Sequence, residues 1–111
     1  MTAYDKECIE HAKRIVESDL HTHWSIAAIA VKVGIGRTKL VLGFKALYGV
    51  GLYAYLRQLR MEKAAELLSN SYRPIKDIAR STGFNHTSNF TISFTDYYGQ
   101  TPTEYRRNGS F

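Results

Sequence analysis

The chain has little cysteine and proline, no long apolar run, and no acidic residue between positions 21 and 61. Its only cysteine, Cys8, has no partner for an internal disulfide, which excludes the stapled scaffolds of small secreted domains. Two prolines and eight scattered glycines leave no flexible linker. No apolar stretch approaches the roughly 20 residues of a membrane-spanning helix, and acids near the start argue against a signal peptide. We therefore expect one compact cytoplasmic domain without a membrane partner.

Positive charge is concentrated in the middle of the chain. The formal net charge is +5, and residues 1–20 and 62–111 hold acids and bases in comparable numbers. The intervening segment contains only bases, namely Lys32, Arg37, Lys39, Lys45, Arg57 and Arg60. Such a basic segment is typical of proteins that contact phosphates. Charge alone leaves open the alternative of a solvated basic face without a partner.

Apolar residues recur at helical spacing through nearly the whole chain. The first helix is predicted over residues 5–19. Further helices are predicted over about 25–34, 36–48, 52–68, 74–83 and 86–98, with a last short helix from 101. Ser25 and Thr101 are expected N-caps, Pro102 a first helical residue and Glu104 part of a capping box. Gly34, Gly49, Gly83 and Gly99 are expected to end helices. The predicted fold is all-α.

The chain repeats itself at an offset of 49 to 50 residues. The offset is 49 for Ile26/Ile75, Ile29/Ile78, Ala30/Ala79 and Gly34/Gly83, and 50 for Leu40/Phe90, Phe44/Phe94, Tyr48/Tyr98 and Gly49/Gly99. One extra residue in the second turn accounts for the change. A duplicated unit of helix, glycine turn and helix is the helix-turn-helix pattern.

The helix predicted between the two copies changes its apolar face halfway along. Leu52, Tyr55, Leu56 and Leu59 share one side, whereas Met61, Ala64, Ala65 and Leu68 share roughly the opposite side. The two ends must therefore pack against different partners. This pattern predicts two helical subdomains joined by one linker helix.

Both halves of the chain contain short motifs that together form a recognisable pattern. In the second half these are Gly83-Phe84, Ser88-Asn89-Phe90, Phe94 and the closing run from Tyr98 to Arg106. In the first half they are Ile29-Ala30, Phe44-Lys45, Tyr48-Gly49, Tyr55-Leu56 and Arg60-Met61. These motifs resemble those of the AraC/XylS family of bacterial transcription regulators. The likeness covers about residues 5–107, and the closing run is its most specific part.

The resemblance implies seven helices in a homeodomain-like arrangement of two helix-turn-helix subdomains. Residues 5–50 would form the first subdomain, 51–69 the linker helix and 73–107 the second subdomain. It also implies sequence-specific binding of double-stranded DNA, with one recognition helix of each subdomain in successive major grooves. Transcriptional activation through RNA polymerase follows from the resemblance alone. Most relatives carry an effector-binding domain, so we expect this chain to be the C-terminal piece of a longer regulator; a short stand-alone regulator is the alternative.

In the first subdomain, the base-reading residues are expected near the start of the recognition helix. Arg37 and Lys39 suit guanine or phosphate, Thr38 suits a base or a phosphate, and Lys45 suits a phosphate. Val41 and Leu42 follow one turn later. The alternative for Arg37 and Lys39 is that both are merely solvated.

In the second subdomain, the candidates are His86, Thr87, Ser88, Asn89 and Thr91. Asn89 suits adenine and the hydroxyls suit bases or phosphates, although Asn85, His86 or Ser88 could instead cap the helix. Family members often have arginine where this chain has Leu42 and Ile92, and lysine where it has Thr95. We therefore predict that the first subdomain dominates the affinity, with Leu42 and Ile92 contacting thymine methyl groups.

No pattern in the sequence indicates catalysis, a metal or a cofactor. His11, His21 and His23 lack a cysteine or carboxylate at ligand spacing, and no nucleophile motif or glycine-rich phosphate loop is present. Trp24 is expected to anchor the entry of the second helix, and most tyrosines are expected to face the core. We predict a protein that is not an enzyme. A helical protein-interaction module that uses Leu42 and Ile92 as an apolar patch is the competing function.

Overall fold

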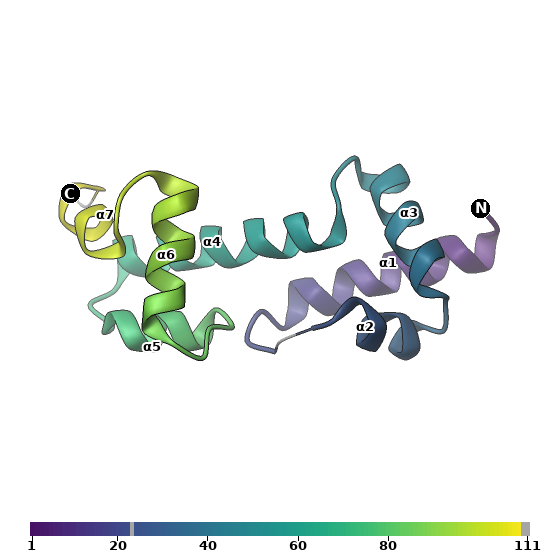
Figure 1. The fold of residues 1–111 in the computed structure, drawn as a ribbon, viewed down its shortest axis with the longest axis horizontal. Helices are drawn as coiled ribbons and strands as arrows, with labels where there is room; N and C mark the ends of the chain where they lie inside the picture. Colours follow the sequence, from purple (N-terminus) through teal and green to yellow (C-terminus); the bar gives the residue numbers. More distant parts are fainter. Residues whose placement is uncertain (23, 110–111) are drawn as a thin grey trace. The chain divides into compact units, whose positions relative to one another are not determined.

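The structure, a computed structural model, describes residues 1–22 and 24–109 and is all-α over that part of the chain (Figure 1). It contains seven helices there: α1 (Ala3–Ser18), α2 (Ile26–Val33), α3 (Arg37–Tyr48), α4 (Leu52–Asn70), α5 (Ile75–Ser81), α6 (Thr87–Tyr98) and α7 (Pro102–Gly109). The predicted fold class is confirmed, and each predicted helix is present within a few residues of its expected bounds. None of these helices combines the length and the apolar character that crossing a membrane requires.

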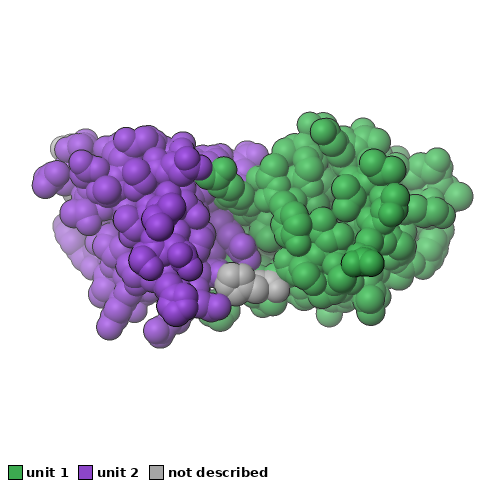
Figure 2. Space-filling view, viewed as in Figure 1, with its two compact units in different colours: residues 1–57 green, residues 58–111 purple. Residues whose placement is uncertain are grey.

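The chain divides into two compact units, residues 1–57 and 58–111 (Figure 2). Helices α1, α2 and α3 belong to the first unit, and α5, α6 and α7 belong to the second. Helix α4 contributes its first six residues, 52–57, to the first unit and the remainder to the second. The apolar face of α4 therefore changes because its first part contributes to the core of the first unit and its later part to the core of the second.

Side-chain capping fixes the start of three helices. Thr2 and Asp5 form a capping box at α1, Ser25 accepts from the N–H of Ala28 at α2, and Thr101 pairs with Glu104 at α7. In the last of these, the Thr101 N–H donates to Glu104 Oε1 at 2.8 Å and the Glu104 N–H donates to Thr101 Oγ1 at 3.1 Å. These caps satisfy N–H groups that have no partner inside the helix. The caps predicted at Ser25 and Thr101 are confirmed.

The core of the first unit forms where α1, α2 and α3 contact one another. Its fully buried side chains include Ile9, Ile29, Leu40 and Phe44. Gly43 is buried where α3 approaches α1, and a Cβ placed there would overlap the side chain of Ile9. The absence of a side chain at this position lets the two helices pack closely.

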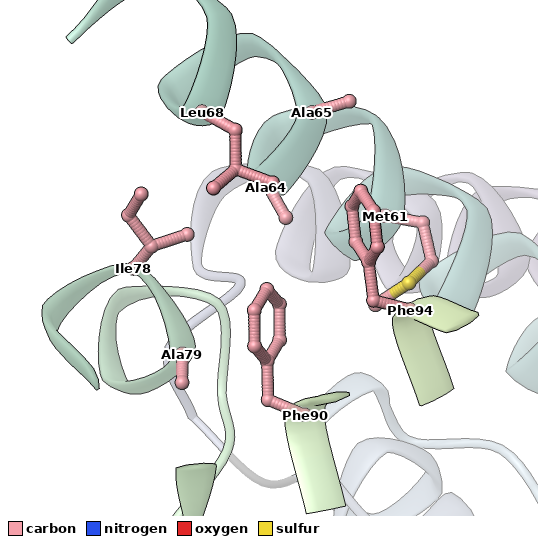
Figure 3. Packing of buried hydrophobic residues seen from close by; sticks show 8 residues of the cluster. All are labelled: Met61, Ala64, Ala65, Leu68, Ile78, Ala79, Phe90 and Phe94. Atoms are coloured by element: carbon pink, nitrogen blue, oxygen red, sulfur yellow. The ribbon is translucent and has the colours of Figure 1, made fainter. Parts of the chain in front are cut away.

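The second unit has a core of its own, in which α4, α5 and α6 meet (Figure 3). Phe90 and Phe94 of α6 point toward Met61, Ala64 and Leu68 of α4 and toward Ile78 and Ala79 of α5. All of these residues are at most 1% exposed. Truncating one buried phenylalanine in such a core typically costs about 3–5 kcal/mol, so each unit depends on its own aromatic residues.

The internal repeat extends further than the glycine-bounded segments. Tyr55 and Tyr105 are also related by an offset of 50, and the ring of each packs against the equivalent phenylalanine. The Phe44–Tyr55 centroids are 5.8 Å apart and the Phe94–Tyr105 centroids 5.3 Å. Phe44–Tyr48 and Phe94–Tyr98 match as well, at 4.8 and 4.7 Å. Each unit therefore carries the same cluster of three aromatic rings.

Two details differ from the sequence-based expectations, and one contact was not anticipated by them. Pro74 is the N-cap of α5 instead of lying in its first turn. The guanidinium of Arg106 donates to the carbonyl oxygens of Leu68 and Ser71 at 3.1 and 3.2 Å, and so ties α7 to the end of α4. Tyrosines were expected mostly in the core, but half of them are exposed, because helical phase alone does not show where a neighbouring helix ends. The exposed ones are Tyr4, Tyr53, Tyr72 and Tyr97.

Candidate nucleic-acid interface

In each unit a short turn leads into a helix whose first residues are exposed. In the first unit, Gly34 has a φ of 82° and Gly36 is the N-cap of α3. In the second, Gly83 has a φ of 92° and His86 is the N-cap of α6. Positive φ values of this size favour glycine, so the glycine expected in each turn has a structural reason. Both turns are helix-turn-helix turns.

The structure places all of the first-unit candidates on the exposed part of α3. Arg37, Thr38, Lys39, Val41, Leu42 and Lys45 are each exposed. The apolar pair is notable because Leu42 is 66% exposed and Val41 39%. In contrast, Leu40 and Phe44 of the same helix are completely buried. One side of α3 therefore builds the core and the other carries the candidate residues.

A groove of about 560 Å³ lies along this exposed side of α3. Its walls come from the start of α2, the first two turns of α3 and Tyr53 at the start of α4. They comprise Ser25, Ile26, Ala27, Arg37, Thr38, Val41, Leu42 and Tyr53. The hydroxyl of Tyr53 accepts a hydrogen bond from the backbone N–H of Ile26 at 3.3 Å, which joins α4 to α2 across the groove. Sequence reasoning did not find this groove, because Ala27 and Tyr53 reach α3 only in the folded unit.

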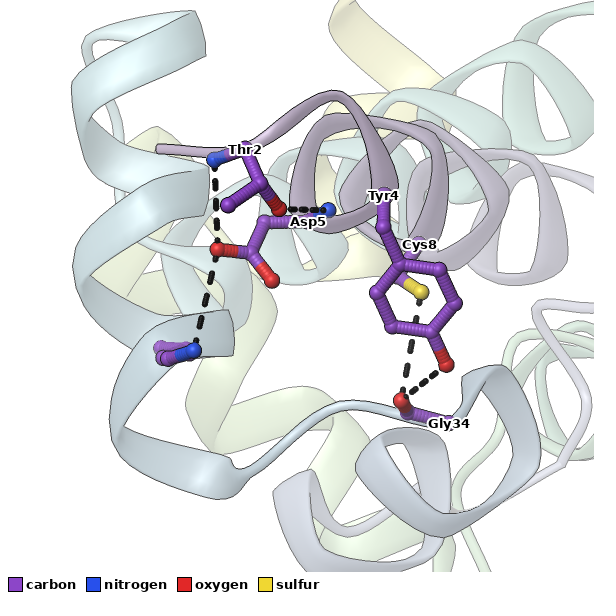
Figure 4. Close-up of polar contacts among 6 residues, drawn as sticks. Thr2, Tyr4, Asp5, Cys8 and Gly34 are labelled. Carbon is purple, nitrogen blue, oxygen red and sulfur yellow. Dashed lines mark hydrogen bonds and ion pairs between the residues drawn. The ribbon is translucent and has the colours of Figure 1, made fainter.

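Helix α1 supports α3 and its turn by polar contacts (Figure 4). The Tyr4 hydroxyl donates to the carbonyl oxygen of Gly34 at 2.6 Å. The interaction with the neighbouring Cys8 thiol raises the pKa of Tyr4 above its ordinary value. Lys39 Nζ lies 3.8 Å from Asp5 Oδ2, while the lysine side chain is 68% exposed. The Asp5 side chain is only 13% exposed, but solvent around the lysine ammonium screens the attraction, which leaves Lys39 available to another anion.

The second-unit candidates lie at the start of α6 and are mostly exposed. His86, Thr87, Ser88 and Asn89 are exposed, whereas Thr91 is half-buried. His86 occupies the N-cap position, but its side chain makes no capping hydrogen bond. Thr95, one turn after Thr91, donates its hydroxyl to the carbonyl oxygen of Thr91 at 2.7 Å. The exposed start of α6 is therefore polar and carries no fixed charge.

Both recognition-helix candidates begin without a side-chain cap. Neither Gly36 at α3 nor His86 at α6 provides a capping hydrogen bond, and the same holds for Pro74 at α5, unlike the N-caps of α1, α2 and α7. The first N–H groups of α3 and α6 therefore keep their donor capacity. Helix N-termini with such donors suit phosphate oxygens.

Two bases of the second unit were not among the predicted site residues. Lys76 and Arg80 on α5 are exposed, and by the 49-residue offset they correspond to Ala27 and Val31 on α2. Since Ala27 lines the groove beside α3, the position of Lys76 corresponds to a groove wall beside α6. The repeat in the sequence already relates Lys76 to Ala27. Only the groove of the first unit shows that this position lies beside a recognition-helix candidate.

Other candidate features add little to this picture. Among the described residues, no three histidine, cysteine or carboxylate side chains form a group that could hold a metal ion. His23, one of the histidines considered above, lies outside the described residues. Cys8 is buried. The indole Nε1 of Trp24 is buried and has no hydrogen-bond acceptor among the described residues, which fits a packing role at the entry of α2.

Comparison with known proteins identifies related sequences. A family model described as "Helix-turn-helix domain" matches residues 29–108. The chain is 36% identical to the Right origin-binding protein of Escherichia coli K12 over 84% of this chain and 32% of that protein. It is 32% identical to a Putative AraC-like transcription regulator of Streptomyces antibioticus over 77% and 28%. It is 31% identical to the Lactose operon transcription activator of Staphylococcus xylosus over 94% and 37%. The chain thus spans about a third of the length of these curated relatives.

Solved structures show the same fold. The C-terminal domain of AraT, a response regulator from Geobacillus stearothermophilus, matches with a TM-score of 0.89 and 26% identity over 94% of this chain and 87% of that one. The DNA-binding domain of AdpA, solved in complex with a target DNA, matches with a TM-score of 0.83 over 89% of each chain. Its identity is 21%, so this second likeness concerns the fold alone.

Proposed function

Because this chain belongs to the AraC-type helix-turn-helix family, we propose that it is a DNA-binding module of a transcription regulator, which recognises a specific sequence in double-stranded DNA. The observation that carries the proposal is the pair of equivalent helices, α3 and α6. Each has a buried aromatic side and an exposed start that lacks a side-chain cap. Exposed residues in the first turns of such a helix are the ones that contact base edges.

The two units would contribute unequally to the affinity for DNA. In the first, α3 combines the cations Arg37, Lys39 and Lys45 with the apolar residues Val41 and Leu42. Cations contact phosphates or guanine, and they make binding dependent on salt. In the second, His86, Thr87, Ser88, Asn89 and Thr91 offer neutral hydrogen-bonding groups. We propose that α3 and α6 enter successive major grooves and that the first unit supplies most of the affinity.

The role of the whole protein is a wider part of the proposal. One relative is named an activator of transcription, which supports activation here, with RNA polymerase as the partner that would be recruited. The length of the curated relatives supports an additional effector-binding domain in the full regulator. Its DNA target would place the protein in the bacterial cytoplasm. Nothing in this role requires enzymatic activity or a cofactor.

A selection of bound sequences from random duplexes tests the proposal. The chain should enrich one family of sequences containing two short elements about ten base pairs apart, the spacing of one DNA turn. Binding to the enriched duplex should weaken steeply with salt. The logarithm of the affinity should fall with the logarithm of the salt concentration by a slope of about 0.9 for each phosphate contacted. No enrichment, or affinity independent of salt, would contradict sequence-specific DNA binding.

A second candidate function is protein interaction through exposed apolar side chains. Leu42 and Ile92 are 66% and 67% exposed, and such residues can mark a contact surface for another protein. This function predicts concentration-dependent self-association that Leu42→Ala abolishes and that DNA does not affect. Sedimentation of the chain with and without the enriched duplex distinguishes the two functions.

A further inference from the structure

The groove beside α3 is lined mainly by apolar side chains. Ile26, Ala27, Val41, Leu42 and Tyr53 supply most of its walls. Leu42 and Tyr53 are 66% and 55% exposed, so their hydrocarbon surface is not used by the core of the first unit. Covering such surface with the hydrogen-bonding edges of bases would leave those base atoms without partners, which is costly.

Base edges in the major groove offer one apolar group that fits, the C5 methyl of thymine. We propose, as an extension of the proposed function, that this groove receives thymine methyl groups and that Leu42 is the main residue selecting them. Thymine-containing steps would then be preferred in the element read by the first unit.

The charge around the groove favours nucleic acid over an apolar protein partner. Arg37 forms part of the groove wall, and Lys39 is exposed two residues further along α3. The segment 21–61, which supplies all of the walls, contains no acidic residue. The DNA phosphates would therefore be attracted to Arg37 and Lys39, while the apolar walls of the groove contact the base edges.

The second unit lacks an equivalent apolar surface. By the offsets of the repeat, Ala27, Val41 and Tyr53 correspond to Lys76, Thr91 and Thr103. The other two apolar positions are kept, because Ile75 stands at the position of Ile26 and the exposed Ile92 at the position of Leu42. Selection for thymine methyl groups should therefore be stronger in the first element of the target than in the second.

Deoxyuridine substitution tests this inference directly, because it removes only the methyl group from thymine. Each thymine of the enriched duplex is replaced in turn, and the dissociation constant is measured at one fixed salt concentration. Loss of a buried methyl contact should weaken binding roughly fourfold at one or two positions. In the Leu42→Ala variant, the same replacements should have almost no effect, since the partner of the methyl group is gone.

Val31→Ala is the matched control, because Val31 is an exposed apolar residue (83%) outside the groove. That variant should keep the sensitivity to deoxyuridine. Thermal unfolding of both variants checks that the exposed substitutions leave the fold intact. If the chain binds its duplex but no thymine is sensitive, or if Leu42→Ala remains as sensitive as the original chain, the inference is wrong while DNA binding stands. If no duplex is bound at all, the proposed function itself fails.

Discussion

Removing the two cations at the start of α3 should weaken DNA binding more than removing two polar residues at the start of α6. The variants are Arg37→Ala with Lys39→Ala, and Ser88→Ala with Asn89→Ala. All four residues are exposed, so neither pair of substitutions should disturb a core. The comparison therefore isolates their contacts with DNA.

The expected magnitudes follow from charge and exposure. A hydrogen bond to a charged group contributes about 1.5–3 kcal/mol and a neutral one about 1 kcal/mol. Lys39 must first leave Asp5, 3.8 Å away, at a cost below about 1 kcal/mol. We expect the α3 variant to lose about 3 kcal/mol, roughly 150-fold in affinity. The α6 variant should lose about 1–2 kcal/mol, roughly five- to thirtyfold in affinity.

Salt dependence distinguishes the two variants even where their affinities overlap. Two lost phosphate contacts reduce the slope of log affinity against log salt by up to about 1.8, whereas loss of neutral contacts leaves the slope unchanged. Fluorescence anisotropy titrations of one labelled duplex at several salt concentrations measure both quantities. An equal or greater loss from the α6 pair, or an unchanged slope in the α3 pair, would refute the unequal division between the units.

Three further outcomes are expected. Lys76→Ala combined with Arg80→Ala should lower the slope of log affinity against log salt by as much as about 1.8. Lys63, whose ammonium pairs with Glu66 at 3.6 Å, provides the control, because Lys63→Ala should leave that slope unchanged in the same titrations. Arg106→Ala should lower the free energy of unfolding of the second unit by about 2 kcal/mol, as measured by urea denaturation, and an unchanged value would contradict its role as a tie to α4. Burial raises the pKa of Tyr98 from 10.0 to about 12, so its neutral form is favoured by folding. Its stabilising contribution is complete below pH 10 and is lost as the pH rises toward 12; tyrosinate absorbance should reveal this late titration, and its absence would contradict the burial of the ring.

Helix bounds were predictable from the sequence because local signals mark them. Ser25 and Thr101 cap their helices through hydrogen bonds to residues three positions later, and such contacts depend only on neighbouring residues. The repeat identified the helix-turn-helix units because Phe44 and Phe94 occupy equivalent buried positions. The exposed positions of the candidate site followed from the same helical phase.

The contacts between helices were not predictable in this way. The hydrogen bond from Tyr4 to Gly34 joins residues 30 positions apart, and the one between Ile26 and Tyr53 joins residues 27 apart. Helical periodicity assigns a side to each residue but not the neighbour that it meets. For this reason the tyrosines were expected mostly in the core although Tyr97, for example, is 39% exposed, and the groove beside α3 was missed.

The repeated aromatic cluster has a consequence for the history of such proteins. Because Phe44, Tyr48 and Tyr55 reproduce Phe94, Tyr98 and Tyr105, each half retains its own hydrophobic centre while the outward residues have diverged. Substitutions among the exposed residues of one recognition helix need no compensating change in the core of the other half. An ancestor with two identical helix-turn-helix units could therefore have come to recognise a DNA target with two different halves by changing one unit at a time, while both units stayed folded.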